Sequence, residues 1–194
     1  MKKLIACLIG GLMLLSVAVT PVASTKIISD TKVLIDAFYT GDLAELMAAT
    51  KDLKAGDTFT IVSTGPGGNA WICLAMMNYI DELEAKGIHV ITEIYGFAAS
   101  ANAFIWLAGD DRRVHKGDML MFHQTIPRGM YGNKIAREHL TEDQRLLVDH
   151  LNNWIRQRLL DIVQDTELVN DMLDADNNWY TGAKLIELGI AKEI

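Results

Sequence analysis

From residue 32 onward, short segments rich in β-branched residues alternate with longer segments whose apolar residues recur at helical spacing. Strands are predicted at 32–38, 59–62, 89–95, 113–115 and 119–122, and helices at 41–53, 70–86, 98–107, 133–164, 167–173 and 181–188. Apolar strands separated by helices are typical of a parallel sheet covered by helices and joined by right-handed crossovers. We therefore expect one α/β domain over residues 25–194.

The first 24 residues, MKKLIACLIGGLMLLSVAVTPVAS, have the composition of a targeting segment. Two lysines precede an almost wholly apolar run at 4–19, and Pro21 is followed by small residues, which predicts a signal peptide cleaved after Ser24. The alternative is an uncleaved N-terminal membrane anchor, because the uncharged stretch is just long enough to span a bilayer. A lipobox at Cys7 is a third interpretation, although it precedes the apolar run. We expect an exported protein, periplasmic or secreted, with membrane contact only if the segment is uncleaved.

Charge and cysteine content exclude several classes of function. The 194 residues include 18 Lys+Arg and 25 Asp+Glu, for a net charge of −7, which argues against nucleic-acid binding. Of the two cysteines, signal removal would leave only Cys73, so no internal disulfide is expected. The sequence has no CxxC motif and no His/Cys cluster, so neither a metal nor another cofactor is expected.

A candidate nucleophile lies in residues 95–103, YGFAASANA. A predicted strand runs into Gly96, and small residues then lead into a predicted buried helix. Small neighbours allow a sharp turn that presents one side chain at the start of the helix. Ser100 is the nucleophile in this segment, and its hydroxyl needs a base to take its proton. The alternative is that Ser100 only caps the helix.

Two further segments could complete such a site. His123 ends the apolar strand of DMLMFHQ, at the strand edge where open α/β sheets place their sites, although a lone histidine can also be structural. The segment 65–68, GPGG, follows an earlier strand. Its glycines permit close backbone approach, so that peptide N–H groups can point at a developing oxyanion. By itself this segment is also compatible with an ordinary turn.

Taken together, the three segments resemble the proteolytic subunit of the Clp protease. That family has a Pro-Gly-Gly loop, a GxAAS nucleophile segment and an apolar strand ending in His-Gln, which correspond here to 66–68, 96–100 and 121–124 in matching order and spacing. The likeness extends from Lys32 to the C-terminus and includes the final Trp-Tyr-Thr-Gly-Ala segment beginning at Trp179. The resemblance implies a Clp/crotonase-type spiral of parallel strands covered by helices, with a long protruding handle helix.

The same resemblance implies a serine endopeptidase and the roles of its residues. Ser100 would be the nucleophile and His123 the general base and then the general acid. The backbone N–H groups of Gly68 and Ala101 would form the oxyanion hole. The third triad member is left open between two residues. A gap-free count back from Trp179 gives Asn177, whereas one extra residue in this loop would bring Asp176 into register; Asp176 is favoured because a carboxylate stabilises an imidazolium better.

Assembly and partners follow from the family and from the proposed location. The resemblance implies a homo-oligomeric ring, with residues 133–164 as the interlocking helix and peptides or unfolded protein segments as substrates. An ATPase unfoldase partner is not expected, because an exported protein meets no ATP pool. Only about seven residues, 25–31, precede the first predicted strand, which leaves little chain for an ATPase-docking loop.

Two alternatives remain open on sequence grounds. A Ser–Lys enzyme of the signal-peptide-peptidase type shares the GxAAS segment, and Lys134 and Lys184 would be its candidate bases. A non-catalytic assembly protein could keep only the fold. The uncertain triad acid motivates that interpretation, as does Asn102, which stands where the family usually has glycine.

Overall fold

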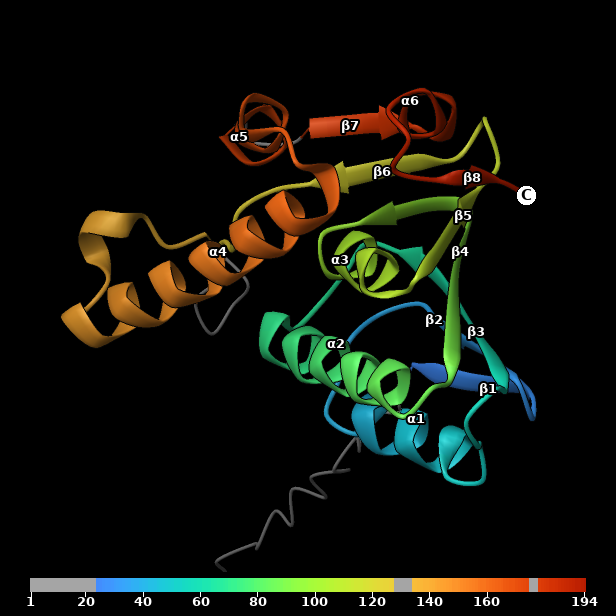
Figure 1. The fold of residues 1–194 in the computed structure, drawn as a ribbon. Helices are drawn as coiled ribbons and strands as arrows, with labels where there is room; N and C mark the ends of the chain where they lie inside the picture. The colour runs from blue at the N-terminus through green and yellow to red at the C-terminus, as the bar shows by residue number, and fades with distance from the viewer. Residues whose placement is uncertain (1–23, 128–133, 175–177) are drawn as a thin grey trace, which may run out of the picture.

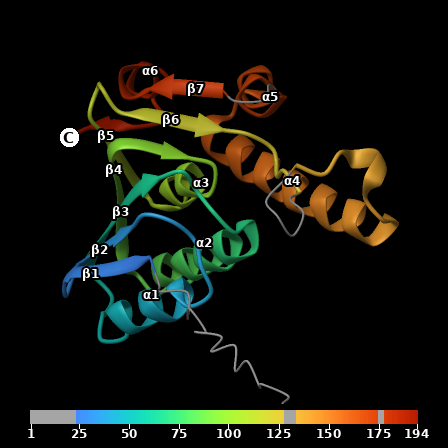
Figure 2. The ribbon, with the colours of Figure 1, turned by 180° about the vertical axis from the view of Figure 1, so that it is seen from behind.

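A computed structural model describes residues 24–127, 134–174 and 178–194 of the chain (Figures 1 and 2). These residues form eight strands in one mostly parallel sheet, together with six α-helices. The prediction of an α/β domain is therefore confirmed. None of the helices in the described part of the chain is both long enough and apolar enough to cross a membrane.

Six strands lie side by side in the sheet. Their order is β1 (Thr25–Ser29), β2 (Lys32–Ile35), β3 (Thr58–Gly65), β4 (His89–Ala99), β5 (Asp111–Val114) and β8 (Lys192–Glu193). The β1–β2 pair is antiparallel, and the other neighbours in this row are parallel. Two strands lie off this row: β6 (Met119–Phe122) pairs in parallel with β4, and β7 (Asn178–Thr181) pairs antiparallel with β6.

The sheet branches at β4. The first half of this strand pairs with β5 through residues 91–93, whereas its last residues, 97–99, pair with β6. Gly96 lies between the two halves with φ 83°, and its N–H donates to the carboxylate of Asp118 over 2.8 Å. Asp118 is buried and also accepts the N–H of His115 over 2.7 Å. Asp118 thus fixes the point at which β4 changes neighbours, and the branch directs the end of β4 toward the candidate nucleophile.

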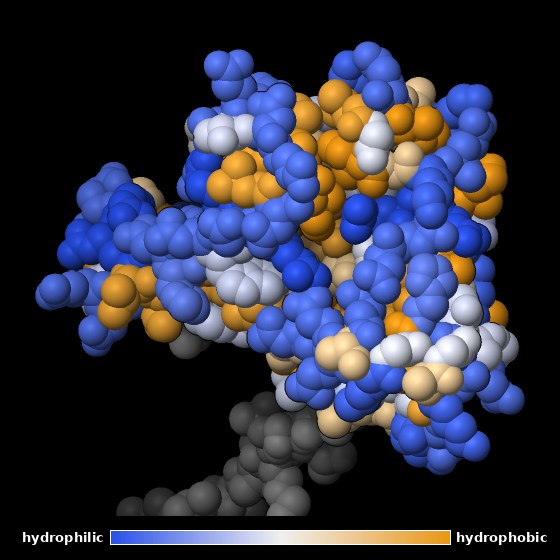
Figure 3. Space-filling model, viewed as in Figure 1, coloured by the Kyte–Doolittle hydropathy of each residue, from blue (hydrophilic) through white to orange (hydrophobic). Residues whose placement is uncertain are grey.

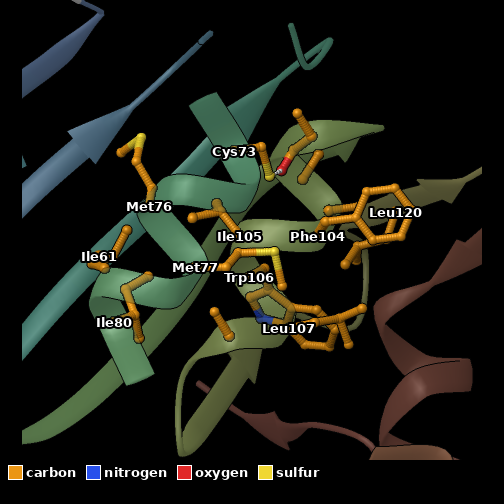
Figure 4. Close-up of a cluster of buried hydrophobic side chains, with 14 of the residues drawn as sticks. Ile61, Cys73, Met76, Met77, Ile80, Phe104, Ile105, Trp106, Leu107 and Leu120 are labelled. Carbon is orange, nitrogen blue, oxygen red and sulfur yellow. Dashed lines mark hydrogen bonds between the residues drawn. The ribbon is translucent and has the colours of Figure 1, made fainter. Parts of the chain in front are cut away.

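The helices lie mainly on one side of this sheet (Figures 1 and 2). They are α1 (Asp42–Thr50), α2 (Ala70–Ala85), α3 (Ala101–Ala108), α4 (Glu142–Val163), α5 (Thr166–Asp174) and α6 (Gly182–Glu187). Every residue of α3 is buried, and α2 packs against it in the core cluster shown in Figure 4. Burial of each large apolar side chain there contributes roughly 1.5–3 kcal/mol. The core thereby holds the N-terminus of α3 in place.

Helix α4 starts later than its sequence pattern predicts. The periodicity suggests a start near 133, whereas α4 begins at Glu142, after a short 3₁₀ turn (Arg137–His139). Thr141 and Gln144 form a reciprocal capping box at this point, with each side chain accepting the other's backbone N–H (3.2 and 3.0 Å). The helix therefore begins where this cap satisfies its first backbone N–H groups, and not where the helical spacing of apolar residues begins.

Three strands and one boundary also differ from the predictions. Residues 25–29 were expected as an unpaired lead but form β1, and β7 and β8 had no counterpart among the predicted strands. The predicted helix from 98 starts at Ala101, because Ala98 and Ala99 still belong to β4. The partners of β7 and β8 lie far away in the sequence, and the start of α3 is set by the branch at β4, so the local pattern carries little information about them. Strand β1 pairs with the strand that follows it, but four of its five residues are exposed, so its sequence has no clear strand pattern.

Helix α4 projects away from the sheet (Figures 1 and 2). Leu146 and Leu147 on this helix are 69% and 50% exposed. Figure 3 shows apolar side chains among hydrophilic ones along one edge of this projecting part. Near its other end, Arg158 forms an ion pair with Asp81 of α2, which fixes α4 to the body of the domain.

Candidate functional site

Ser100 occupies a strained turn between β4 and α3. Its backbone has φ 55° and ψ −124°, and it is one of two non-glycine residues with positive φ in the described part of the chain. Its N–H donates to the carbonyl of Met121 on β6 over 2.9 Å, which ties the turn to the branch of the sheet. The Ser100 side chain makes no capping hydrogen bond, so the helix-cap interpretation is wrong. Such conformations cost about 1–3 kcal/mol and cluster at functional sites.

The glycine-rich loop presses directly against this turn. Gly67 has φ 96°, and a Cβ built on it would lie 2.7 Å from the Cβ of Ser100 and 2.8 Å from the carbonyl oxygen of Ala99. A Cβ on Gly68 would lie 2.7 Å from the backbone nitrogen of Phe38, with which Gly68 forms an isolated β-bridge. Both glycines are therefore required by close contacts, and the loop is more specific than an ordinary turn.

Asn102 holds this loop in position. Its side chain is fully buried, and its Oδ1 accepts the N–H of Gly67 over 2.8 Å. Its Nδ2 donates to the carbonyl of Ile35 and to the hydroxyl of Ser63, both over 3.0 Å. Buried amides bonded in this way are costly to remove, by roughly 1–3 kcal/mol. This role could not be predicted from the sequence, because no spacing rule links a residue of α3 to a loop some 35 positions earlier.

His123 follows directly on β6. Its Nδ1 lies within hydrogen-bonding distance of the carbonyl oxygen of Gln124. A hydrogen bond to a carbonyl requires the Nδ1–H form of the ring, which leaves Nε2 as the basic nitrogen. This tautomer is the one that a general base acting through Nε2 requires.

Ser100 and His123 line the same cleft, which has a volume of about 760 Å³. Gly68 and Ala101 line it as well, so four of the six predicted site residues meet there. Gly67, which was not among the six, also lines the cleft. The rest of the described lining is mostly apolar and includes no Asp, Glu, Lys or Arg: Trp71, Leu74, Met77, Phe104, Ile126, Pro127, Ile135, Leu140, Leu147, Val148, Leu151, Trp154 and Ile155. An apolar cleft with few polar groups strengthens any electrostatic contact made inside it.

The two candidate lysine bases lie in other places. Lys134 lines a smaller cavity of about 260 Å³, which His123 also borders but Ser100 does not. Lys184 lies on α6, where its Nζ is 3.0 Å from Glu187.

Cys73 does not compete with Ser100 as a nucleophile, although it borders the same cleft. Burial raises the pKa of its thiol well above the usual range, so the thiol stays protonated. Its Sγ donates to the carbonyl of Ala101 over 3.3 Å. No group of three or more His, Cys, Asp or Glu side chains in the described residues could hold a metal ion.

The predicted third triad members, Asp176 and Asn177, lie outside the described residues. The strand that follows them is described: β7 begins at Asn178, which lies opposite Phe122 on β6. Phe122 immediately precedes His123, so the start of β7 and the candidate base are close neighbours.

Comparison with known proteins gives no assignment: neither a protein-family model nor a curated protein matches this chain.

Proposed function

We propose that the protein is a serine endopeptidase that hydrolyses peptides or unfolded protein segments. One observation carries the proposal: a serine in a strained strand-to-helix turn packs under a glycine loop and shares an apolar cleft with a histidine. A serine presented on such a turn is the usual arrangement of an activated nucleophile.

The proposed reaction uses these groups in sequence. Nε2 of His123 takes the proton of the Ser100 hydroxyl as Oγ attacks the peptide carbonyl. The N–H groups of Gly68 and Ala101 stabilise the oxyanion, and Ala101 is the first residue of α3, where backbone N–H groups point away from the helix. His123 then protonates the leaving amine, and water hydrolyses the acyl-enzyme through the same base.

The proposed fold family is the Clp/crotonase type, in which parallel strands form a spiral. The branch at β4, which sends β6 and β7 away from the main row, supports this assignment. The projecting α4 would be the handle helix that joins copies of the chain into a ring, and its exposed Leu146 and Leu147 suit such a contact.

The proposed location is outside the cytoplasm, after removal of residues 1–24. In support, β1, the first strand of the described residues, starts at Thr25, directly after the predicted cleavage site. After cleavage, residues 25–29 would be held in β1 by pairing with β2 and would not be free to form an ATPase-docking loop. We therefore propose that the enzyme acts without an unfoldase, on peptides or segments that are already unfolded.

A fluorophosphonate probe tests the proposal on the purified protein. We expect covalent labelling at Ser100, identified by peptide mass, and a loss of labelling in His123→Ala, because the hydroxyl then has no base. Labelling that persists in His123→Ala but disappears in Lys134→Ala would favour the Ser–Lys alternative. A folded wild-type protein that takes up no probe and cleaves no peptide would favour the non-catalytic assembly protein.

The identity of the third triad member is a separate prediction. We expect Asp176→Ala to reduce turnover by orders of magnitude more than Asn177→Ala, because a carboxylate stabilises the imidazolium formed during attack. Peptide hydrolysis by the two variants, compared at matched thermal stability, measures this. If Asn177→Ala is the more damaging change, the triad is Ser-His-Asn and Asp176 is a surface charge.

A further inference from the structure

Asp42, the first residue of α1, is a fully buried carboxylate. Its Oδ1 accepts the backbone N–H of Thr25 over 2.7 Å. Its Oδ2 accepts the hydroxyl of Ser24 over 3.0 Å and the N–H of Tyr39 over 2.5 Å. These donors are uncharged, and no described Lys, Arg or His forms an ion pair with Asp42. A buried carboxylate without a cation is costly, which raises the question of what balances its charge.

We propose that Asp42 is the binding site for the α-ammonium group that signal removal creates on Thr25. Water adds across the Ser24–Thr25 peptide bond, catalysed by a signal peptidase of the host. The new carboxylate of Ser24 leaves with the leader, and the Thr25 nitrogen becomes an amine that is protonated at neutral pH. The buried ion pair would form between this ammonium and Asp42.

The geometry suits an ammonium better than the amide it replaces. The Thr25 nitrogen already lies 2.7 Å from Oδ1, so no chain movement is needed to form the pair. Departure of Ser24 frees two acceptors that its hydroxyl holds, Oδ2 of Asp42 (3.0 Å) and the carbonyl of Ala37 (2.5 Å). An ammonium has two more N–H donors than an amide, so it brings added donors as well as the positive charge to the place where the Ser24 hydroxyl is lost.

The site is also connected to the candidate active site. Tyr39, whose N–H binds Asp42, follows Phe38, and Phe38 pairs with Gly68 of the glycine loop. The carbonyl of Phe38 further accepts the N–H of Asn69 over 3.3 Å. The ion pair would therefore stabilise the segment against which the oxyanion loop packs.

The sign of the pH dependence follows from the ammonium. An α-amine titrates near pH 7.7–8.0 in an unfolded chain, and pairing with Asp42 would raise its pKa in the fold. The resulting stability is present below about pH 8 and is lost as the pH rises through the folded value. Other ionisable groups on α1 and on the elements packed against it are Lys26, Asp36, Tyr39, Glu45, Cys73, Tyr79, Asp81, Glu82 and Glu84. They are common to the wild type and Asp42→Asn, so the difference between these two profiles isolates the pair.

The experiment uses the full chain, exported from a bacterium and purified. Its intact mass should show Thr25 as the first residue. Urea unfolding between pH 6.5 and 9.5 should show a larger loss of stability with rising pH in the wild type than in Asp42→Asn, where the contribution of Glu84, whose pKa burial raises to about 7, remains. Asp36→Asn is the matched control, since Asp36 is an exposed carboxylate of the same segment that pairs with Lys26, and it should keep the wild-type profile. A different first residue, or identical profiles for wild type and Asp42→Asn, overturns the proposal.

A second measurement covers the case in which Asp42→Asn fails to fold. The rate at which an amine-selective anhydride modifies the Thr25 α-amine at pH 7 is compared between folded protein and protein in urea. We expect slower modification in the fold, by roughly tenfold for each unit of raised pKa. Equal rates would refute the ion pair.

The inference rests on the proposed export but not on peptidase activity, so an unreactive Ser100 would refute the endopeptidase and leave this result standing.

Discussion

Replacing Ser100 with alanine is expected to abolish peptide hydrolysis while leaving the protein folded. The change removes the attacking oxygen, which should lower the rate by on the order of 10⁴-fold or more. The Ser100 side chain makes no capping hydrogen bond, and its N–H bond to Met121 involves only the backbone, so its truncation removes little stabilising contact. Hydrolysis of a fluorogenic peptide, with circular dichroism as the measure of folding, tests both parts.

A serine outside the cleft provides the control for this variant. Ser29 is an exposed residue of β1, and Ser29→Ala makes the same chemical change without touching the cleft. We expect it to retain wild-type turnover. Wild-type activity in folded Ser100→Ala would refute the endopeptidase proposal.

The second large effect is expected from Gly67→Ala. The added Cβ would lie 2.7 Å from the Cβ of Ser100 and 2.9 Å from the backbone nitrogen of Ala101, so the loop or the nucleophile turn must move. Displacement of an oxyanion donor or of the nucleophile typically costs on the order of 10²-fold or more in rate. We expect turnover to fall by at least this amount and the unfolding midpoint to fall as well, as measured by peptide hydrolysis and urea titration.

Gly56→Ala separates backbone strain from the close contact. Gly56 has φ 93°, nearly the φ of 96° at Gly67, but a Cβ on it would meet nothing within 4 Å. Both substitutions therefore carry a similar cost of about 1–2 kcal/mol for a positive φ. The activity loss should appear only in Gly67→Ala. Equal and mild effects in the two variants would show that the loop does not depend on its contact with Ser100.

Much of the fold could be predicted because the strands in the middle of the sheet are apolar and locally bounded. The strand at Met119–Phe122 was predicted at its observed bounds, and the helix predicted at 70–86 lies at Ala70–Ala85. Asn69 explains the sharp start of that helix, since its side chain accepts the N–H of Trp71 over 2.9 Å. Ser100, His123 and the glycine loop could be singled out because each lies in a short local motif, and the structure places them around one cleft.

The remaining features depend on pairing and burial, which the local sequence pattern does not reveal. In β1 four of five residues are exposed, so no alternating pattern distinguishes this strand from an extended lead. Asn102 appeared as a departure from a family pattern, whereas its amide bonds two strands and the loop at once. The carboxylate of Asp42 looked like an ordinary acidic residue in the first turn of a helix, and only its burial indicates another role.

The pairing of β6 has a consequence for the order in which the molecule folds. One partner of β6, the strand β4, precedes it in the chain, but the other, β7, follows only after α4 and α5. Until β7 has been synthesised and has paired, β6 presents an open edge of unpaired N–H and C=O groups beside His123. Pairings across long stretches of chain form slowly. A chain in which β7 has not yet paired would thus already contain Ser100 and His123 but leave the strand edge beside His123 open, so this side of the candidate site would be completed only at the end of folding.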